Sequence, residues 1–209
     1  MHTKIQEIDL SKLCDMDVEI SSGNPFENLQ YLQAMEESKS AAKNTGWIPS
    51  HLGELDDGKL KSFLPLYKKF NSYGEFIFDH QWANALQQTG RNYYPKLLTA
   101  IPFTPCEGDR VLGGNEVQKI NLIDSCIERL EEEQIESWHI LFPNDAGKKI
   151  FRSQNFIERF NYRFVWHNNN FLSFDDFLSV FTSRQRATIR KERKSIIREE
   201  ITFKSKNFD

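Results

Sequence analysis

The strongest concentration of one chemical type lies near the carboxyl end of the chain, in residues 183–198. Seven residues of this segment are Lys or Arg. At about 100° per residue of an α-helix they fall in one half of the helical wheel, whereas Ile189 and Ile196 fall in the other half. Cations gathered on one helix face bind phosphate oxygens. The candidate phosphate-binding residues are Arg184, Arg186, Arg190, Lys191, Arg193 and Lys194, and Arg198 is the seventh cation.

A solvated helix is the competing interpretation of this segment, because Glu192, Glu199 and Glu200 are close enough in sequence to pair with the same cations. One-sided clustering is uncommon for a helix that is only solvated, so the pattern favours anion binding. The residues do not distinguish phosphate on a nucleotide-linked substrate from phosphate on RNA.

Two residues are candidates for proton transfer, Asp79 and His167. Asp79 follows the apolar residues 76–78, where a strand is expected to end and a helix to begin. Backbone N–H groups converge at such a junction, although an Asp there also serves as a plain helix N-cap. His167 follows the apolar residues 164–166 at a second expected strand end, where an imidazole can act as a general base.

Aromatic and polar side chains near these two candidates are suited to line a pocket. Pro95 and Pro102 leave backbone groups outside ladder pairing, which either holds a substrate amide or protects an edge strand. Turn formation alone would explain the asparagines after His167, and the core would explain Trp82. Cys106 has no His or Asn at a recognisable spacing and is not expected to be a nucleophile. The candidate pocket residues are Trp82, Tyr93, Tyr94, Lys96, Trp166 and Asn168.

Alternating strands and helices must position these residues. Asp57-Gly58 between two apolar runs is a hairpin signal, since Gly tolerates positive φ. We predict strands at 47–55, 59–68, 73–78, 93–103, 137–142 and 156–167, and helices from Pro25, from Asp79, after Asn115, from Asn144 and from Ser173. The expected fold is therefore α/β (α+β), with a mixed, largely antiparallel sheet flanked by helices and followed by a basic C-terminal helix.

The composition is that of a globular chain, with 39% hydrophobic, 13% aromatic and 27% charged residues among 209. The net charge of −3 gives no overall attraction to nucleic acid or anionic lipid. Cys14, Cys106 and Cys126 form no CxxC pair or Cys/His cluster, so we expect neither a disulfide scaffold nor a metal site. The polar N-terminus and the absence of a long apolar run predict a cytoplasmic protein without a membrane span.

Four ordered blocks together resemble a known family. They are residues 72–79 (SYGEFIFD), 93–105 (YYPKLLTAIPFTP), 164–178 (FVWHNNNFLSFDDFL) and 183–194 (SRQRATIRKERK). Over most of residues 20–198 the chain resembles the peptidoglycan biosynthesis/recognition family of predicted N-acyltransferases, which is Fem-like and placed among GNAT folds. The resemblance implies a lead-in at 1–24, a GNAT-like domain at 25–172 and a C-terminal helical segment with the basic face at 173–209.

Two features depart from the family pattern. Family members extend past the basic helix into a second GNAT-like half, which this chain is expected to lack because it ends at Asp209. The acyl-CoA signature of GNAT enzymes, Gln/Arg-x-x-Gly-x-Gly/Ala, aims backbone N–H groups at a pyrophosphate. It is absent, and the join at residues 78–80 has no glycine. The resemblance implies no tightly bound cofactor, with acyl-CoA and aminoacyl-tRNA as the candidate donor substrates.

The resemblance implies transfer of an acyl or aminoacyl group to an amino group, on a cell-wall precursor in this family. Such chemistry needs positioning, loss of a proton and donors for the developing oxyanion. Asp79 or His167 would assist the proton, and the basic helix would hold phosphates. Two other functions stay open: a non-catalytic recognition module for a phosphorylated ligand, and an RNA-binding domain in which Tyr93 and Tyr94 stack on bases. The expected partners are a small or phosphorylated substrate and tRNA, and the oligomeric state is left unspecified.

Overall fold

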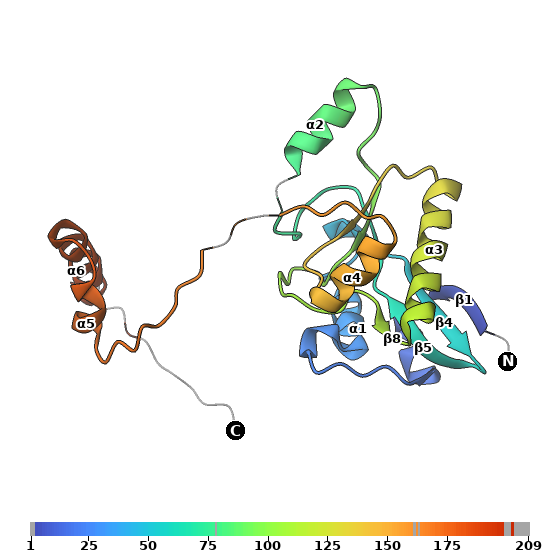
Figure 1. The fold of residues 1–209 in the computed structure, drawn as a ribbon, viewed down its shortest axis with the longest axis horizontal. Helices are drawn as coiled ribbons and strands as arrows, with labels where there is room; N and C mark the ends of the chain where they lie inside the picture. The colour runs from blue at the N-terminus through green and yellow to red at the C-terminus, as the bar shows by residue number, and fades with distance from the viewer. Residues whose placement is uncertain (1–2, 78, 161, 163, 199–201, 203–209) are drawn as a thin grey trace. The chain divides into compact units, whose positions relative to one another are not determined.

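The structure is a computed structural model that describes residues 3–77, 79–160, 162, 164–198 and 202. The chain forms two compact units, Met1–Glu158 and Arg159–Asp209 (Figure 1). The described residues between 159 and 172 form no helix or strand. The domain bounds that the resemblance implies, 25–172 and 173–209, stay a prediction.

The first unit contains a five-stranded sheet in which the expected lead-in takes part. Its strands are β1 (Thr3–Ile8), β4 (His51–Asp56), β5 (Lys59–Leu64) and β2 (Asp17–Val18) in that order, with β8 (Leu112–Gly113) also paired to β5. Only the β2–β5 pair is parallel within this sheet. Asp57 and Gly58 both have positive φ between β4 and β5, as the hairpin signal predicts.

A second sheet of four strands positions the site described below. Its order is β3 (Trp47–Pro49), β6 (Tyr67–Lys69), β7 (Lys96–Thr99) and β9 (Trp138–Ile140). The β7–β9 pair is parallel and the other two pairs are antiparallel. The runs predicted as single strands at 47–55 and 59–68 each contribute one strand to each sheet, so the same two segments run through both.

Helices cover both faces of these strands. The helices of the first unit are α1 (Leu29–Glu37), α2 (His80–Gln88), α3 (Glu116–Glu132) and α4 (Asp145–Ser153), with 3-10 turns at Leu10–Asp15, Pro25–Glu27 and Lys43–Thr45. Buried residues of α1 join a cluster with Phe63, whereas those of α3 join a cluster with Leu64. Successive strand residues point to opposite faces, so α1 and α3 lie on opposite faces of β5. By contrast, α2 has no buried residue and projects from the sheets (Figure 1).

Three expected strands differ from the structure. Residues 73–77 form a loop, with Phe78 outside the described residues. The strand expected at 93–103 is limited to β7, since Pro95 and Pro102 flank it and cannot donate to a ladder. The described residues of 156–167 form no strand, and the side chains of Tyr162 and Phe164 are fully exposed. Period-two spacing predicts an apolar face, but a strand also needs a neighbouring backbone.

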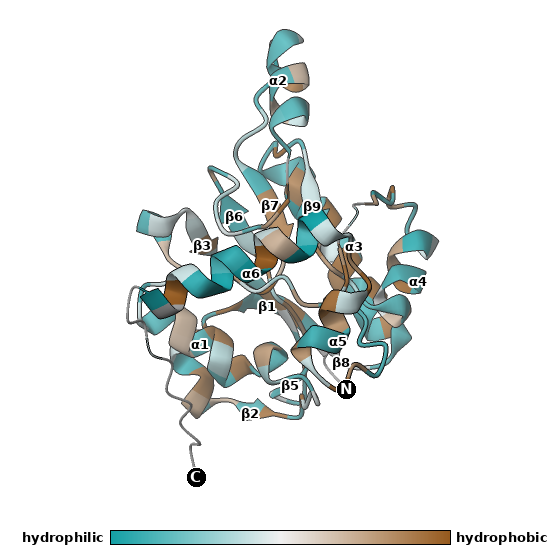
Figure 2. Cartoon of the chain, turned by 90° about the vertical axis from the view of Figure 1, so that its left-hand side faces the viewer, coloured by the Kyte–Doolittle hydropathy of each residue, from teal (hydrophilic) through white to brown (hydrophobic). Residues whose placement is uncertain are grey.

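The second unit contains α5 (Phe174–Ser179) and α6 (Ser183–Arg198). Ser173 caps α5 by accepting a hydrogen bond from the Asp176 N–H at 3.0 Å, which agrees with the helix predicted from Ser173. The Phe177 ring contacts four other rings of this unit, and α6 is largely hydrophilic (Figure 2). The expected basic helix is therefore present.

The two mixed sheets, the flanking helices and the basic helix confirm the predicted α/β (α+β) class. Within the part of the chain that the structure describes, no helix is long and apolar enough to cross a bilayer.

Candidate functional site

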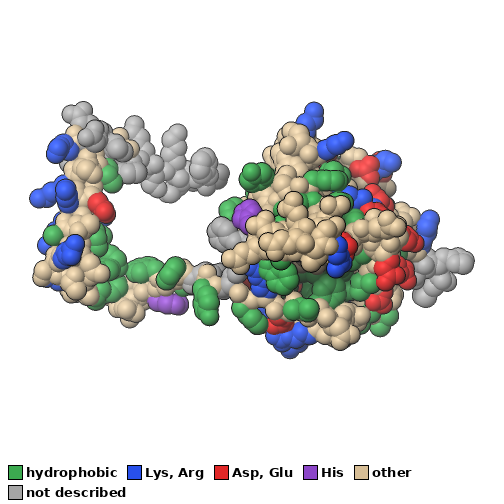
Figure 3. All heavy atoms as spheres, turned by 90° about the horizontal axis from the view of Figure 1, so that it is seen from above, with side chains coloured by type: hydrophobic (Ala, Val, Ile, Leu, Met, Phe, Trp, Pro, Cys, Tyr) green, Lys and Arg blue, Asp and Glu red, His purple; other side chains and the backbone are tan. Residues whose placement is uncertain are grey.

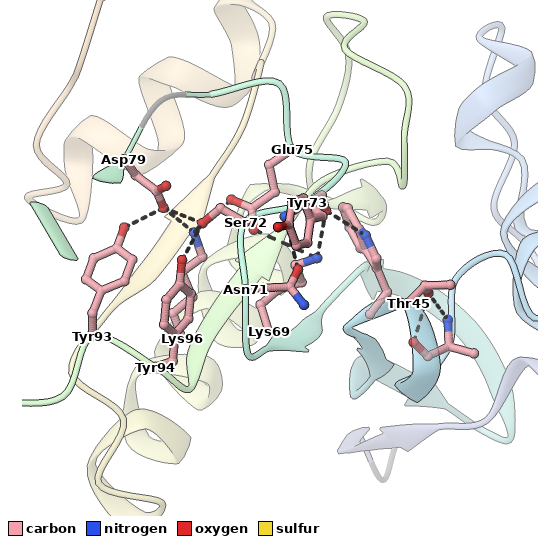
Figure 4. A network of polar contacts seen from close by, with 12 residues as sticks. Thr45, Lys69, Asn71, Ser72, Tyr73, Glu75, Asp79, Tyr93, Tyr94 and Lys96 are labelled. Carbon is pink, nitrogen blue, oxygen red and sulfur yellow. Dashed lines mark hydrogen bonds and ion pairs between the residues drawn. The ribbon is translucent and has the colours of Figure 1, made fainter. Parts of the chain in front are cut away.

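Two lysines lie directly opposite each other in the second sheet and are fully buried. Lys69 on β6 and Lys96 on β7 are partners in the antiparallel register, and each is 0% exposed. Like charges across a ladder repel, and a buried charge is costly unless it is paired. The connection between β6 and α2 supplies the compensation, because its Glu75 and Asp79 are 2% and 0% exposed beside the lysines (Figure 4).

The Lys96 ammonium group uses all its donors within this cluster. Its Nζ donates to Ser72 Oγ at 2.9 Å, to Glu75 Oε2 at 2.8 Å and to Asp79 Oδ2 at 2.6 Å. The Tyr94 hydroxyl lies 2.8 Å from the same Ser72 oxygen. Lys96 therefore holds both carboxylates of the loop against the sheet, and its full set of hydrogen bonds offsets part of the desolvation cost.

One oxygen of Asp79 is saturated and the other is free of donors. Oδ2 accepts from Lys96, from Ser72 Oγ at 2.7 Å and from the Tyr93 hydroxyl at 2.8 Å. Burial acts to raise the pKa of Asp79, but these three hydrogen bonds outweigh it and lower the pKa to about 2. Oδ1 is buried and has no hydrogen-bond partner among the described residues. Asp79 occupies the N-cap position of α2, as expected, but its side chain makes no capping hydrogen bond and is directed to the lysine cluster instead.

Lys69 and Glu75 form a looser pair. Lys69 Nζ donates to the Tyr73 carbonyl at 3.0 Å, lies 3.9 Å from the Trp47 ring centroid and is 3.9 Å from Glu75 Oε1. Burial lowers the pKa of Lys69 to about 8, with Glu75 opposing the shift, and burial also raises the pKa of Glu75. Glu75 Oε1 is buried and lacks a hydrogen-bond donor within the described part of the chain.

The Tyr93 hydroxyl connects this cluster to β9. It donates to Asp79 and lies 3.3 Å from His139 Nε2. Burial, followed by the hydrogen bond to Asp79, raises the pKa of Tyr93 well above its ordinary value. The hydroxyl therefore stays protonated and acts as a donor to the carboxylate.

The structure brings together four of the residues that the sequence analysis selected: Asp79, Tyr93, Tyr94 and Lys96. Trp82 lies outside this network, on α2, and is 59% exposed, so it does not belong to the core. Sequence reasoning missed Lys69, Glu75 and Ser72. The available signal was that Lys69 directly follows the expected strand 59–68, since a lysine that continues a buried strand needs a partner.

The candidates Trp166, His167 and Asn168 belong to the second unit. The Asn168 Oδ1 atom accepts from the Phe171 N–H at 3.1 Å, which supports the turn role for this side chain. Trp166 is 65% exposed and packs edge-on against Phe177. His167 is exposed to solvent.

The basic face of α6 divides into two sets. Arg186 donates to the Phe181 carbonyl, Arg190 pairs with Asp175 at 3.0 Å, and Arg193 stacks over the Phe174 ring at 4.0 Å. Arg190 and Arg193 thus link α6 to α5, and Arg186 binds the segment that joins the two helices. A second set is exposed and makes no side-chain hydrogen bond or ion pair with the described residues: Arg184, Lys191, Lys194 and Arg198.

A glycine-containing join between a strand and a helix lies at residues 110–115 instead of 78–80. Its sequence, Arg-Val-Leu-Gly-Gly-Asn, has the Arg-x-x-Gly spacing of the acyl-CoA signature, but Asn115 stands where Gly or Ala is expected. Asn115 caps α3 by accepting from the Gln118 N–H at 3.0 Å. The Arg110 side chain is buried and donates to the Leu141 carbonyl at 2.6 Å. The signature is therefore incomplete.

The chain belongs to the FemAB-like family, which is described as peptidoglycan biosynthesis/recognition. The family model matches residues 4–208, and this match confirms the resemblance seen in the sequence. Among solved structures, a ribosomal-protein-alanine N-acetyltransferase from Brucella melitensis biovar Abortus 2308 is similar at 13% identity and a TM-score of 0.45. The similarity covers 80% of this chain and 100% of that chain. A search of curated proteins found no match.

Proposed function

We propose that the protein is an N-acyltransferase that forms an amide on an amino group of a cell-wall precursor. Family membership over residues 4–208 supports the link to peptidoglycan. The buried cluster of Lys69, Glu75, Asp79 and Lys96 supports the chemistry, because an amine acceptor must be bound as an ammonium ion and then lose a proton.

The observation that carries the proposal is a pair of buried carboxylate oxygens, Glu75 Oε1 and Asp79 Oδ1, to which no described residue donates a hydrogen bond. A buried acceptor left unpaired costs about 1–3 kcal/mol, so a ligand that brings donors is favoured there. A primary ammonium group carries three N–H donors and a positive charge. The acceptor amine of the substrate fits this requirement.

The reaction has a simple balance of bonds. The ammonium loses one proton, the nitrogen lone pair attacks the acyl carbon, and a new C–N bond forms. The bond between the acyl carbon and the oxygen or sulfur of the donor breaks, and that atom leaves with the electron pair. The nitrogen loses its second proton in this step, and the leaving oxygen or sulfur takes up a proton. Holding amine and acyl carbon in contact supplies most of the rate enhancement expected of such a site.

The donor is proposed to carry phosphate, as acyl-CoA and aminoacyl-tRNA both do, which would place the reaction in the cytoplasm. The exposed cations Arg184, Lys191 and Lys194 support this choice, since their side chains are not used by the described part of the second unit. The incomplete acyl-CoA signature at 110–115 favours aminoacyl-tRNA of the two.

The test is amide formation by the whole chain. Purified protein is incubated with labelled acyl-CoA or aminoacyl-tRNA and a nucleotide-linked muropeptide that carries a free amino group, and the product is measured by mass spectrometry. We expect a labelled amide with one donor class, and a rate lower by about 100-fold or more in Glu75→Gln. Glu54→Gln is the matched control, because Glu54 is also a buried carboxylate with one unpartnered oxygen but lies in the other sheet. A folded protein that yields no amide with either donor contradicts the proposal.

A non-catalytic recognition module is the second candidate. It is favoured by the closure of the cluster, whose four charged side chains are at most 2% exposed. Binding of a muropeptide without turnover, measured as an increase in thermal stability with no product, would select this function.

A further inference from the structure

We propose that Glu75 and Lys69, instead of Asp79, are the proton-exchanging pair of the buried cluster. This inference rests on the proposed acyl transfer and names the residues that would remove the proton from the acceptor. It concerns side chains that the sequence did not select.

Asp79 is poorly placed to take a proton. Its Oδ2 atom already accepts three hydrogen bonds, from Lys96, Ser72 and Tyr93, and these donors stabilise the ionised carboxylate. Protonation of Asp79 would remove the charge-assisted hydrogen bond of 2.6 Å between its Oδ2 atom and the Lys96 ammonium group. Its pKa of about 2 agrees with this geometry, because a base that weak holds almost no proton near neutral pH. Asp79 is a positioning residue.

Glu75 has the free acceptor that a base requires. One oxygen, Oε2, is held by Lys96 at 2.8 Å, and the other, Oε1, has no donor among the described residues. The held oxygen orients the carboxylate while the free oxygen is available to an ammonium proton. Glu75 is therefore anchored and unsaturated at the same time.

Lys69 is the acceptor to which that proton can pass. Its Nζ lies 3.9 Å from Glu75 Oε1 and makes one hydrogen bond, to the Tyr73 carbonyl. The Trp47 ring stabilises the charged form through its face. The Lys69 nitrogen thus lies in the same buried region as the Glu75 oxygen that lacks a donor among the described residues, and in its amine form it can accept a proton there.

The charges around Lys69 act in opposite directions. Glu75 and Asp79 favour the ammonium form, whereas Lys96 on the neighbouring strand and burial favour the amine. Burial lowers the pKa of Lys69 to about 8 and raises the pKa of Glu75, so both shifts narrow the difference between the two groups. A smaller difference favours proton exchange between them, as acid–base catalysis requires.

The proton transfer balances without any further reactant. An N–H bond of the acceptor ammonium breaks and an O–H bond forms on Glu75 Oε1, leaving a neutral amine. When Lys69 is in its amine form, the carboxylic acid passes the proton to Nζ and returns to the carboxylate. Lys69 then releases the proton to solvent, with no net change in the pair.

The loop that carries Glu75 must open for an acceptor to enter, since the cluster is closed to solvent. This loop, residues 71–77, presents two large rings outward, with Tyr73 77% and Phe76 60% exposed. It is held down through the Tyr73 carbonyl, which accepts from Lys69 and from Trp47 Nε1 at 3.1 Å. Because Lys69 is one of these two donors, loop opening and proton release involve the same side chain.

The first experiment titrates Lys69 directly and needs no substrate. The whole chain is labelled with 13Cε-lysine, and the Lys69 signal is assigned by its loss in Lys69→Arg. We expect a midpoint near pH 8, and a lower midpoint in Glu75→Gln because the variant removes the carboxylate that favours the ammonium form. Glu54→Gln should leave the midpoint unchanged. If Lys69 titrates at the same pH as the exposed lysines, at about 10.4, the proposal is overturned.

The second experiment separates catalysis from positioning by chemical rescue. Glu75→Ala removes the base and leaves a cavity, so added formate should restore amide formation in this variant by tenfold or more. Asp79→Ala should not be rescued, because its loss displaces Lys96 instead of removing a proton acceptor. Equal rescue of both variants, or of neither in an active enzyme, contradicts the assignment. If the protein transfers no acyl group but Lys69 titrates near pH 8, the proposed function is contradicted. The assignment of Glu75 and Lys69 as a proton-exchanging pair would still stand.

Discussion

Lys96 decides how the buried charges are compensated. Lys96 lies opposite Lys69 in the strand register and forms ion pairs with both Glu75 and Asp79. The charge of every other member of the cluster is therefore influenced by Lys96. Two lysines and two carboxylates make the cluster neutral in sum. Removing one member leaves a buried charge unpaired, which costs far more than the intact pair contributes.

Replacing Lys96 therefore tests the cluster. We expect Lys96→Met to lower the free energy of unfolding by about 3–5 kcal/mol, because Glu75 and Asp79 lose their shared cation. The measurement is urea denaturation of the whole chain. Lys61→Met is the control, since the Lys61–Glu19 pair is partly exposed and should cost less than about 1 kcal/mol. Similar losses in the two variants would contradict this reading.

Asp79 gives a pH dependence with a definite sign. Its folded pKa of about 2 lies below the unfolded value of about 3.9, so the ionised form stabilises the fold. That contribution is complete above about pH 4 and is lost as the pH falls from about 4 to about 2. The difference in unfolding free energy between the wild type and Asp79→Asn should shrink over this window. Parallel curves in acid would show that Asp79 is not held as an anion.

The loop between β6 and α2 is the element that brings the carboxylates to the lysines. Gly74 makes its path feasible, because the residue has a φ of +78° and packs against the Phe103 ring. An added Cβ would lie 2.5 Å from Phe103 Cε1. The loop is thus shaped by one glycine and held by the contacts of the Tyr73 carbonyl.

We expect Gly74→Ala to destabilise the protein by about 1–3 kcal/mol, since it adds backbone strain and a clash with Phe103. Gly58→Ala is a matched control: its φ is +81°, yet nothing lies within 4 Å of the added Cβ. Both variants share the backbone strain, so their difference in urea denaturation isolates the packing against Phe103. Faster hydrogen exchange of residues 71–77 should appear in Gly74→Ala alone. An equal effect of the two substitutions would argue against the contact.

The two units of the molecule carry opposite net charges. Residues 159–209 contain 11 Lys and Arg against 6 Asp and Glu, whereas residues 1–158 contain 16 against 24. In the second unit, Lys and Arg side chains gather along α6 (Figure 3). The overall charge of −3 conceals this division, so attraction to a polyanion is expected of one unit only.

Polyanion binding tests this division. We expect the protein to bind a heparin column at low salt despite its net negative charge, and to elute at lower salt after combined substitution of Lys191, Lys194 and Arg198 by Gln. The control replaces Lys12, Lys39 and Lys43, which are exposed cations of the first unit, and should leave elution unchanged. Flow-through of the wild-type protein at low salt would remove the argument for a phosphate-binding face.

The sequence by itself determined the fold class, the Asp57-Gly58 hairpin, the basic helix, two members of the buried cluster, Asp79 and Lys96, and their hydrogen-bonding neighbours Tyr93 and Tyr94. These features depend on local patterns: turn residues, helical spacing, and polar side chains next to apolar runs. The family likeness also followed from four ordered blocks and extends over residues 4–208.

Only the tertiary structure selected Lys69 and Glu75 and divided the described cations of the basic face into paired and unpaired ones. It also showed that the described residues of 156–167 pair with no strand. Burial and cross-strand register made Lys69 a neighbour of Lys96, although 27 positions separate them in sequence. The physical reason is that the pKa and the availability of a side chain depend on what surrounds it in space. Local periodicity contains no information about which distant backbone or charge will lie there.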